Sequence, residues 1–297
     1  MELFRNTKFD FLGRKWWFIA PTLVLLFAGA LSLAVKGGPL YGIEFRGGAV
    51  LDVLWKGRPP VEQIRAAVER RVSSASVVVA HDASGSNEVL VSAQLPADRD
   101  LSRLGQDLQS ALSTVGSGFS VRSMEAIGPE ISADVGHRAL LAMGGASAGM
   151  LLYLAWRFRW PYGVAAVLAM AHDAFITIGV FSLLNQEISL TVVAALLTLI
   201  GYSMNDTIVV FDRIRENRLT IRHESFAETV NRSINQTLSR TVLTSGLTLT
   251  SALSLLIFGG PVLYGFSLAL VIGIIVGTFS SIFIASPILA AAAGGSR

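Results

Sequence analysis

The sequence predicts a polytopic α-helical membrane protein with six transmembrane helices and one external α+β domain. Of its 297 residues, 52% are hydrophobic and only 15% are charged, with a mean hydropathy of +0.56. Soluble domains carry about a quarter charged residues. The charge is also uneven, because residues 36–138 hold 11 basic and 12 acidic residues whereas 241–296 hold none. Six apolar segments are long enough to cross a bilayer, since a spanning helix needs about 20 predominantly apolar residues.

The composition excludes several kinds of chemistry. Cysteine is absent, so the chain has no disulfide, no thiolate metal site and no cysteine nucleophile. Neither a G-x-x-x-x-G-K-[ST] phosphate loop nor an H-E-x-x-H motif occurs. We therefore expect no catalytic residues, no metal and no cofactor. The net charge of +3 does not indicate nucleic-acid binding, because most basic residues flank apolar segments.

The six apolar segments divide the chain into membrane and aqueous parts. The first 35 residues resemble a signal peptide, but their apolar run exceeds the usual 7–15 residues, so we expect a retained anchor. The last span is long enough to tilt or to extend beyond the bilayer. The predicted spans are approximately 16–35, 139–156, 162–184, 188–211, 241–258 and 262–290. The predicted aqueous parts are 1–15, 36–138, 212–240 and 291–297.

The distribution of Lys and Arg near the span ends predicts the orientation. Four basic residues precede the first span, two lie in the loop 157–161, six lie in 212–240, and Arg297 ends the tail. The loops 185–187 and 259–261 have none. Both termini are therefore predicted to be cytoplasmic, with residues 36–138 on the outside. We expect the membrane to be the cytoplasmic (inner) membrane.

The external segment has the pattern of a small α+β domain. Strands are predicted at 48–56, 77–80, 88–92 and 119–126, with a hairpin turn at 84–87. Apolar residues at helical spacing predict helices at 60–72 and 101–112. The order β-α-β-β-α-β is the ferredoxin-like, split βαβ pattern. We interpret this domain as a rigid contact module without an active site.

Two aspartates are predicted to lie within the membrane. An ionisable group at that depth costs about 2.5–3.5 kcal/mol, so it usually faces protein or a water-filled path. Asp206 lies in the fourth span, and Tyr202 and Thr198, four and eight residues earlier, are predicted to share its face as a polar stripe. We favour a proton relay for Asp206 over a purely structural cross-link. For Asp173, which follows His172 in the third span, both interpretations stay open.

Arg240 ends a cytoplasmic amphipathic segment. Ser225 and Glu228 form a capping box, and apolar residues follow at four-residue spacing. This pattern predicts a helix that lies on the inner face and leads into the fifth span, so Arg240 would be close in depth to Asp206. From the residues alone, cytoplasmic anchoring by positive charge is the favoured explanation of Arg240, ahead of a special role beside Asp206.

Small residues recur every four positions along the sixth span and cluster in the second. Such faces let helices approach closely. Either packing within the chain or docking of a second membrane subunit explains them. The residues are Gly265, Ala269, Gly273 and Gly277, and Gly144, Gly145, Ala148 and Gly149.

Several motifs together resemble the SecF family of protein-export membrane subunits, within the RND superfamily. The long motif 201–217 of the fourth span is specific, whereas the glycine motif 42–48 alone is weak. Glu44 stands where the family commonly has Asp, and Ile127 where Val is usual. The matching positions include Gly42, Glu44, Phe45, Gly47, Gly48, Gly128, Pro129, His172, Asp173, Gly201, Asn205, Asp212, Arg213 and the motif 231–241.

The resemblance implies an RND-type six-span half that uses the proton-motive force in the late stages of preprotein translocation. It implies that Asp206 is the proton-responsive aspartate, with the adjacent Asn205 as a further proton-coupling residue, and that Arg240 is functionally important. It leaves Asp173 undecided. Implied partners are SecD, the SecYEG translocon and unfolded preprotein, with YajC and YidC as further candidates. The alternatives are half of an RND-type small-molecule or lipid exporter, and a scaffold that only stabilises SecD.

Overall fold

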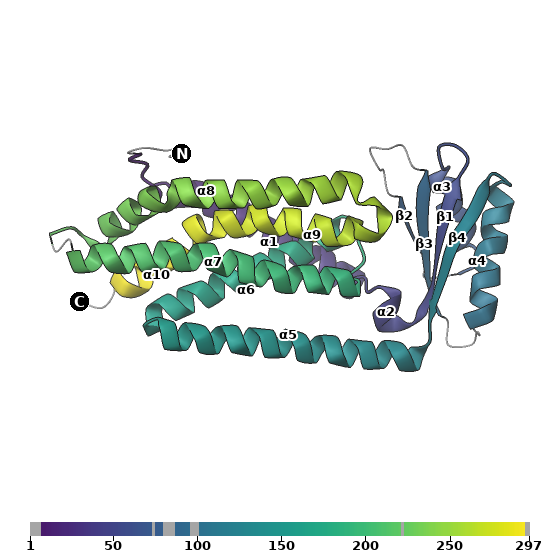
Figure 1. Cartoon of the computed structure of the whole chain (residues 1–297), viewed down its shortest axis with the longest axis horizontal. Coiled ribbons are helices and arrows are strands. Elements are labelled where there is room, and N and C mark those ends of the chain that lie inside the picture. The colour runs from purple at the N-terminus through teal and green to yellow at the C-terminus, as the bar shows by residue number, and fades with distance from the viewer. Residues whose placement is uncertain (1–6, 73–74, 80–86, 96–100, 221–222, 295–297) are drawn as a thin grey trace.

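The computed structural model describes residues 7–72, 75–79, 87–95, 101–220 and 223–294. It is a bundle of long helices with an α+β domain at one end (Figure 1). Six helical segments are long and apolar enough to span a membrane, as predicted. They are α1 (Lys15–Lys36), α5 (Pro129–Arg157), α6 (Trp160–Leu183), α7 (Leu190–Thr220), α8 (Phe226–Phe258) and α9 with its continuation (Gly260–Ala292).

The external domain has the predicted order of elements. Its four strands form one antiparallel sheet in the order β2-β3-β1-β4, which is the split βαβ arrangement. Both helices pack on one face, where Leu51, Ile64 and Leu108 are fully buried. Most of the predicted turn at 84–87 lies outside the described residues. The elements are α2 (Ile43–Arg46), β1 (Gly48–Trp55), α3 (Val61–Glu69), β2 (Ala75–Val79), β3 (Glu88–Gln94), α4 (Leu101–Val115) and β4 (Phe119–Ile127).

Three helices form the centre of the membrane bundle. Between 44% and 61% of the most apolar stretch is buried in α6, α7 and the α9 span, compared with 11–17% in α1, α5 and α8. The start of α1, the end of α7 and the start of α8 all lie at the end of the bundle remote from the sheet (Figure 1). Polar groups held by the central helices are therefore the ones that the bundle removes from lipid and water.

Two predicted boundaries differ from the structure. Helix α5 begins ten residues before the predicted span, because Gly128 is its N-cap and Pro129 occupies the first helical position. The segment 226–240 does not lie on the inner face as a separate amphipathic helix. It is the first half of the continuous helix α8, and its buried residues Val230 and Ile234 pack with Phe211 of α7. Another helix, rather than lipid, covers the apolar face.

The small residues of the sixth span pack within the chain. A Cβ atom added at Gly273 would overlap Leu199 of α7, and one added at Gly277 would crowd Ser203. This stripe therefore lets α9 approach α7. After α9 the span continues through a π-helical turn (Ser281–Ala285) into α10 (Ser286–Gly294). In contrast, a Cβ at Gly144, Gly145 or Gly149 of α5 would meet nothing within 4 Å.

Two asparagines of α8 hold the chain that precedes α1. Asn231 Oδ1 accepts hydrogen bonds from the backbone N–H groups of Phe11 and Leu12, at 3.0 and 3.1 Å. Its Nδ2 donates to Asp10 at 2.7 Å, and Asn235 bonds both backbone groups of Phe9. The motif 231–241 thus ties the first half of α8 to the start of the first span.

Replacing Asn231 with alanine is expected to release this segment. The N–H groups of Phe11 and Leu12 lose their acceptor, so their hydrogen exchange should accelerate roughly fivefold, since a hydrogen bond contributes about 1 kcal/mol. Amide hydrogen exchange on the solubilised protein measures this. Arg232→Ala is the matched control, because Arg232 pairs with Glu224 instead. Equal protection in the two variants would contradict the prediction.

The same contact predicts a pH dependence. The backbone N–H of Gly13, and then the Asn231 amide, hold the pKa of Asp10 below its usual value of 3.8. A lowered pKa in the folded state means that the contact stabilises above about pH 4 and loses this contribution as the pH falls further. Protection of residues 9–13 should therefore be constant near neutral pH and decline only under strongly acidic conditions.

Candidate functional site: buried aspartates of the membrane bundle

Asp206 lies on the buried face of α7 and is only 4% exposed. Ser245 of α8 donates its hydroxyl to Asp206 Oδ2 at 3.0 Å. Among the described residues this is the one hydrogen bond to the carboxylate, and it comes from a neutral group. A serine hydroxyl can donate to a carboxylate or accept from a carboxylic acid. Both protonation states of Asp206 therefore have a partner in this arrangement.

Arg240 is the positively charged residue that acts electrostatically on Asp206. It lies on α8, five residues before Ser245, and its side chain is exposed. Its charge attracts the Asp206 carboxylate, but within the described part of the chain the two groups form no ion pair. A buried carboxylate on α7 and an exposed arginine on α8 are thus coupled through charge rather than through a direct contact. The attraction between α7 and α8 depends on whether Asp206 carries its charge.

The predicted polar stripe on α7 is only partly correct. Tyr202 is half-buried, and its hydroxyl is buried without a hydrogen-bond partner among the described residues. Thr198, however, is exposed and donates to Ala194 O of its own helix. The reason is geometric. Each residue turns an α-helix by about 100°, so the eight residues between Thr198 and Asp206 amount to two full turns and about 80° more. Thr198 does not share the buried face.

Asp173 is the second buried carboxylate of the bundle. It is 2% exposed, and its two carboxylate oxygens have three side-chain partners on three helices. His172 Nδ1 lies 2.9 Å from Oδ1, while the hydroxyls of Ser203 on α7 and Ser280 on α9 donate to Oδ2 at 2.5 and 2.7 Å. Asp173 therefore cross-links α6, α7 and α9 at the centre of the bundle.

Sequence reasoning missed the hydroxyl partners of both aspartates. Ser203, Ser245 and Ser280 are buried and were not candidates. Spacing would have been misleading for one of them, because Ser203 lies three residues before Asp206 on α7 but bonds Asp173 of α6. Serines within helices usually bond the carbonyl of their own preceding turn, as Thr207 and Thr248 do here. The position of a serine in the sequence does not reveal whether its hydroxyl bonds its own helix or a side chain on another helix.

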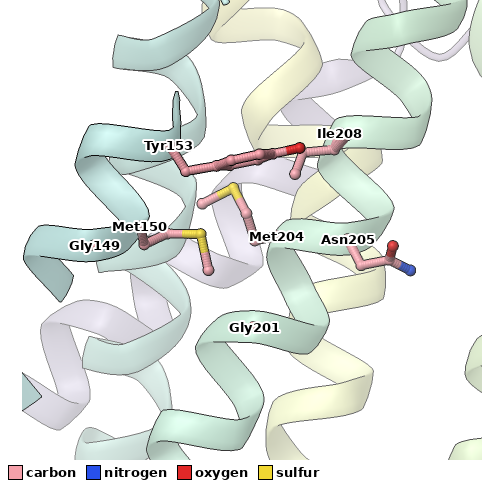
Figure 2. Close-up of a pocket in the computed structure, with 7 residues that line it drawn as sticks. All are labelled: Gly149, Met150, Tyr153, Gly201, Met204, Asn205 and Ile208. Atoms are coloured by element: carbon pink, nitrogen blue, oxygen red, sulfur yellow. The ribbon is translucent and has the colours of Figure 1, made fainter. Parts of the chain in front are cut away.

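Asn205 does not join the Asp206 cluster. It is exposed and lines a groove of about 410 Å³ between α5 and α7. Figure 2 shows Met150 and Tyr153 of α5 reaching toward Met204 of α7, while the Asn205 amide is turned away from α5. Gly201 is also in this groove, and a Cβ there would meet nothing within 4 Å. The α7 helix thus presents Asp206 to α8 and Asn205 to the outside of the chain.

The motif residues at the end of the bundle remote from the sheet form ion pairs along and between helices. Arg157 Nη2 at the end of α5 lies 2.8 Å from both carboxylate oxygens of Asp212. Arg213 pairs with Glu216 one turn further along α7, at 2.9 Å. Such partly exposed pairs contribute at most about 1 kcal/mol each. Asp212 and Arg213 therefore position the helix ends rather than form part of the buried site.

The glycine motif 42–48 shapes the entry to the external domain. Gly47 and Gly48 have φ angles of 75° and 154°, and a Cβ at Gly48 would overlap Ala93 O of β3. Phe45 packs against the bundle beside Ile188. The ring of Tyr41 meets the ring of Phe45 edge-on, with 5.9 Å between the ring centroids. Gly42 and Gly128 are the N-caps of α2 and α5, the latter followed by Pro129, while Glu44 lies in the first turn of α2.

Comparison with known proteins identifies the family. The family described as "Protein export membrane protein SecD/SecF, C-terminal" matches residues 107–294. The SecF subunit of Koribacter versatilis is 41% identical, covering 98% of this chain and 93% of its own length. That of Escherichia coli O157:H7 is 37% identical, over 94% and 86%. The chain belongs to the SecF family.

The SecF fold is also present in a longer, fused protein. The crystal structure of SecDF from Thermus thermophilus superimposes with a TM-score of 0.82 at 39% sequence identity, over 96% of this chain. This chain spans 39% of that SecDF chain. A second SecDF structure, in a super-membrane-facing form, gives a TM-score of 0.64 at 38% identity. The SecF and SecDF relatives are translocase subunits, so this chain is a multi-pass membrane protein of a protein-transport family.

No metal site is evident in this SecF family member. Among the described residues, no group of three or more His, Asp and Glu side chains is arranged to hold a metal ion. His172 and Asp173 are neighbours, but their further partners are serine hydroxyls.

Proposed function

We propose that this chain is the SecF subunit of a SecD–SecF complex in the cytoplasmic membrane, with both termini cytoplasmic. The complex uses the proton-motive force to promote the late stages of Sec-dependent preprotein translocation. The observation that carries this proposal is Asp206, a carboxylate buried in a membrane bundle, bonded to one neutral hydroxyl and attracted by Arg240. Intramembrane ionisable residues that face the bundle interior mark proton relays.

In the proposed mechanism, proton binding neutralises Asp206 and removes its attraction to Arg240. Helices α7 and α8 then repack, and the external domain moves. One charge crossing 100 mV supplies about 2.3 kcal/mol. Shifting a two-state equilibrium from 1:99 to 99:1 takes about 5.5 kcal/mol. Complete switching therefore needs more than one proton, or a pH gradient in addition to the potential.

Conformational change is also supported by the relatives. The two SecDF structures match this chain with TM-scores of 0.82 and 0.64 at nearly the same identity and coverage. Sequence divergence does not account for that difference, since the identities are 39% and 38%. The difference indicates that the corresponding part of SecDF adopts more than one arrangement.

SecD is the proposed membrane partner. SecDF proteins carry both parts in one chain, of which this chain corresponds to 39%. The exposed polar residues Thr198 and Asn205 on α7, and the open glycines of α5, form a face that is costly to leave in lipid. Small and polar residues are typical of helix interfaces in membranes. SecYEG and unfolded preprotein are proposed as further partners, and YajC and YidC as additional candidates.

The test is preprotein translocation into membrane vesicles that contain this chain, SecD and the translocon. A preprotein is arrested after ATP-driven initiation, and a proton gradient is then imposed. We expect completion to accelerate, and a protonophore to remove the acceleration. Vesicles without this chain are the control. Completion that is equally fast with and without the gradient would refute the proposed function.

A further inference from the structure

The loop between α6 and α7, residues 184–189, is bonded directly to the external domain. Ser92 on β3 donates its hydroxyl to Glu187 Oε1 at 2.7 Å. Gly42 N donates to Ile188 O at 3.0 Å, and Ile188 N donates to Leu40 O at 2.7 Å. Tyr41 and Ile188 therefore form a parallel β-bridge. These hydrogen bonds join the loop both to the segment that leads into the sheet and to strand β3 of the sheet itself.

The junction is packed as well as bonded. Ile188 is buried in an apolar cluster with Phe181 and Val192, against which Phe45 of α2 packs. A Cβ atom added at Gly42 would lie 3.3 Å from the backbone of Ser189, so the two segments approach closely. This contact accounts for the first residues of the glycine motif. Their role is to seat the segment 40–45 on the α6–α7 loop.

The other side of the loop is held by the first span. Lys36 at the end of α1 donates to Asn185 Oδ1 at 2.7 Å and also bonds Ser182 O. Asn185 has a φ angle of 54°, a conformation that asparagine tolerates better than most residues. A loop tethered on both sides transmits displacement, whereas a loose loop would absorb it.

The helices that this loop connects are the two that carry the buried aspartates. Asp173 lies on α6 and Asp206 on α7, on either side of residues 184–189. A shift of the outer end of α7 or α6 must therefore displace Ile188 and Glu187, and with them the attached sheet. We infer that the 184–189 loop is the mechanical joint between the proton-binding bundle and the external domain, with Glu187 as its positioning residue. This inference rests on the proposed function.

The first test replaces the two bonded side chains in the full SecD-containing complex. Glu187→Ala and Ser92→Ala should each reduce gradient-dependent completion roughly tenfold, as the loss of a hydrogen bond to a charged group does in an equilibrium. The double variant should show no further loss. Glu187→Gln keeps an acceptor for Ser92 and should retain most of the activity. ATP-driven initiation and membrane abundance should be unchanged.

Gln186→Ala is the matched control, since Gln186 lies in the same loop and its side chain bonds only Leu184 O among the contacts described. If Glu187→Ala and Ser92→Ala both complete gradient-dependent translocation at the wild-type rate, the inference that this loop is the joint is wrong. Asp206→Asn, measured in the same vesicles, separates the two proposals. If it abolishes gradient dependence while Glu187→Ala does not, the joint is wrong and the proposed function stands. If neither variant has an effect, the proposed function fails.

A second readout does not depend on translocation. Hydrogen exchange of the β3 amides should differ between the wild-type complex and the Asp206→Asn complex, because the bundle state reaches the sheet through the loop. That difference in β3 exchange should disappear when Glu187→Ala is introduced into both the wild-type complex and the Asp206→Asn complex. Exchange in β3 that does not respond to Asp206→Asn would also overturn the joint.

Discussion

Replacing Asp206 with asparagine is expected to abolish the gradient-dependent phase of translocation, by more than tenfold, while ATP-driven initiation continues. Asparagine has nearly the size of aspartate and can still accept the Ser245 hydroxyl, so the packing of α7 against α8 should survive. It cannot bind and release a proton in the required range, and it has no charge for Arg240 to attract. Only the cycle between two charge states is lost.

The measurement compares completion rates in vesicles with equal amounts of the variant and equal co-purification of SecD. Glu216→Gln makes the same chemical change on the same helix, but at a carboxylate that is 65% exposed and paired with Arg213. This control should keep the gradient dependence. A gradient-dependent phase that survives Asp206→Asn but disappears when the whole chain is deleted would instead support the scaffold interpretation.

Replacing Asp173 with alanine is expected to destabilise the bundle severely. The substitution removes the acceptor of three side-chain hydrogen bonds that join α6, α7 and α9. Ser203 and His172 would be left in the buried centre without these partners, at about 1–3 kcal/mol for each unsatisfied group. We expect a large fall in thermal stability and in membrane abundance, measured by thermal unfolding and size-exclusion chromatography of the solubilised complex.

Asp173→Asn is the informative companion. Its amide oxygen can accept from Ser203 and Ser280, and its NH₂ group can donate to His172 Nδ1 once the neutral imidazole carries its proton on Nε2. All three contacts are then kept without a charge. We expect Asp173→Asn to fold and to retain gradient-dependent translocation, which would assign Asp173 a structural role. Loss of that phase in a stably folded Asp173→Asn complex would place Asp173 in the proton path instead.

Much of the architecture could be predicted because it depends on local patterns. Apolar length identified the six spans, and alternating apolar residues identified the strands of the external sheet. The exception was the segment 226–240, predicted to lie on the inner face. Its apolar stripe is real, but periodicity cannot tell whether lipid or another helix covers a stripe. Phe211 and Ile214 of α7 cover it.

The candidate site was predicted less completely. Asp206, Asp173 and Arg240 stand out because charge in or beside an apolar span is costly and therefore rare. Ser203, Ser245 and Ser280 do not stand out, since a serine in a helix satisfies itself on its own backbone. Asn205 was assigned with Asp206 because the two are adjacent in the motif. On a helix, however, adjacent residues are turned about 100° apart, and Asn205 faces outward.

The sequence by itself determined the number of spans, the order of the external elements and which ionisable groups lie at membrane depth. These properties follow from hydropathy and periodicity within one segment. Only the tertiary structure decided that Asp173 is bonded by serines of α7 and α9, that Ser245 bonds Asp206, and that Glu187 meets Ser92. Those pairs are separated by 30 to 107 residues. Their geometry is set by how the helices pack against one another, which no local pattern specifies.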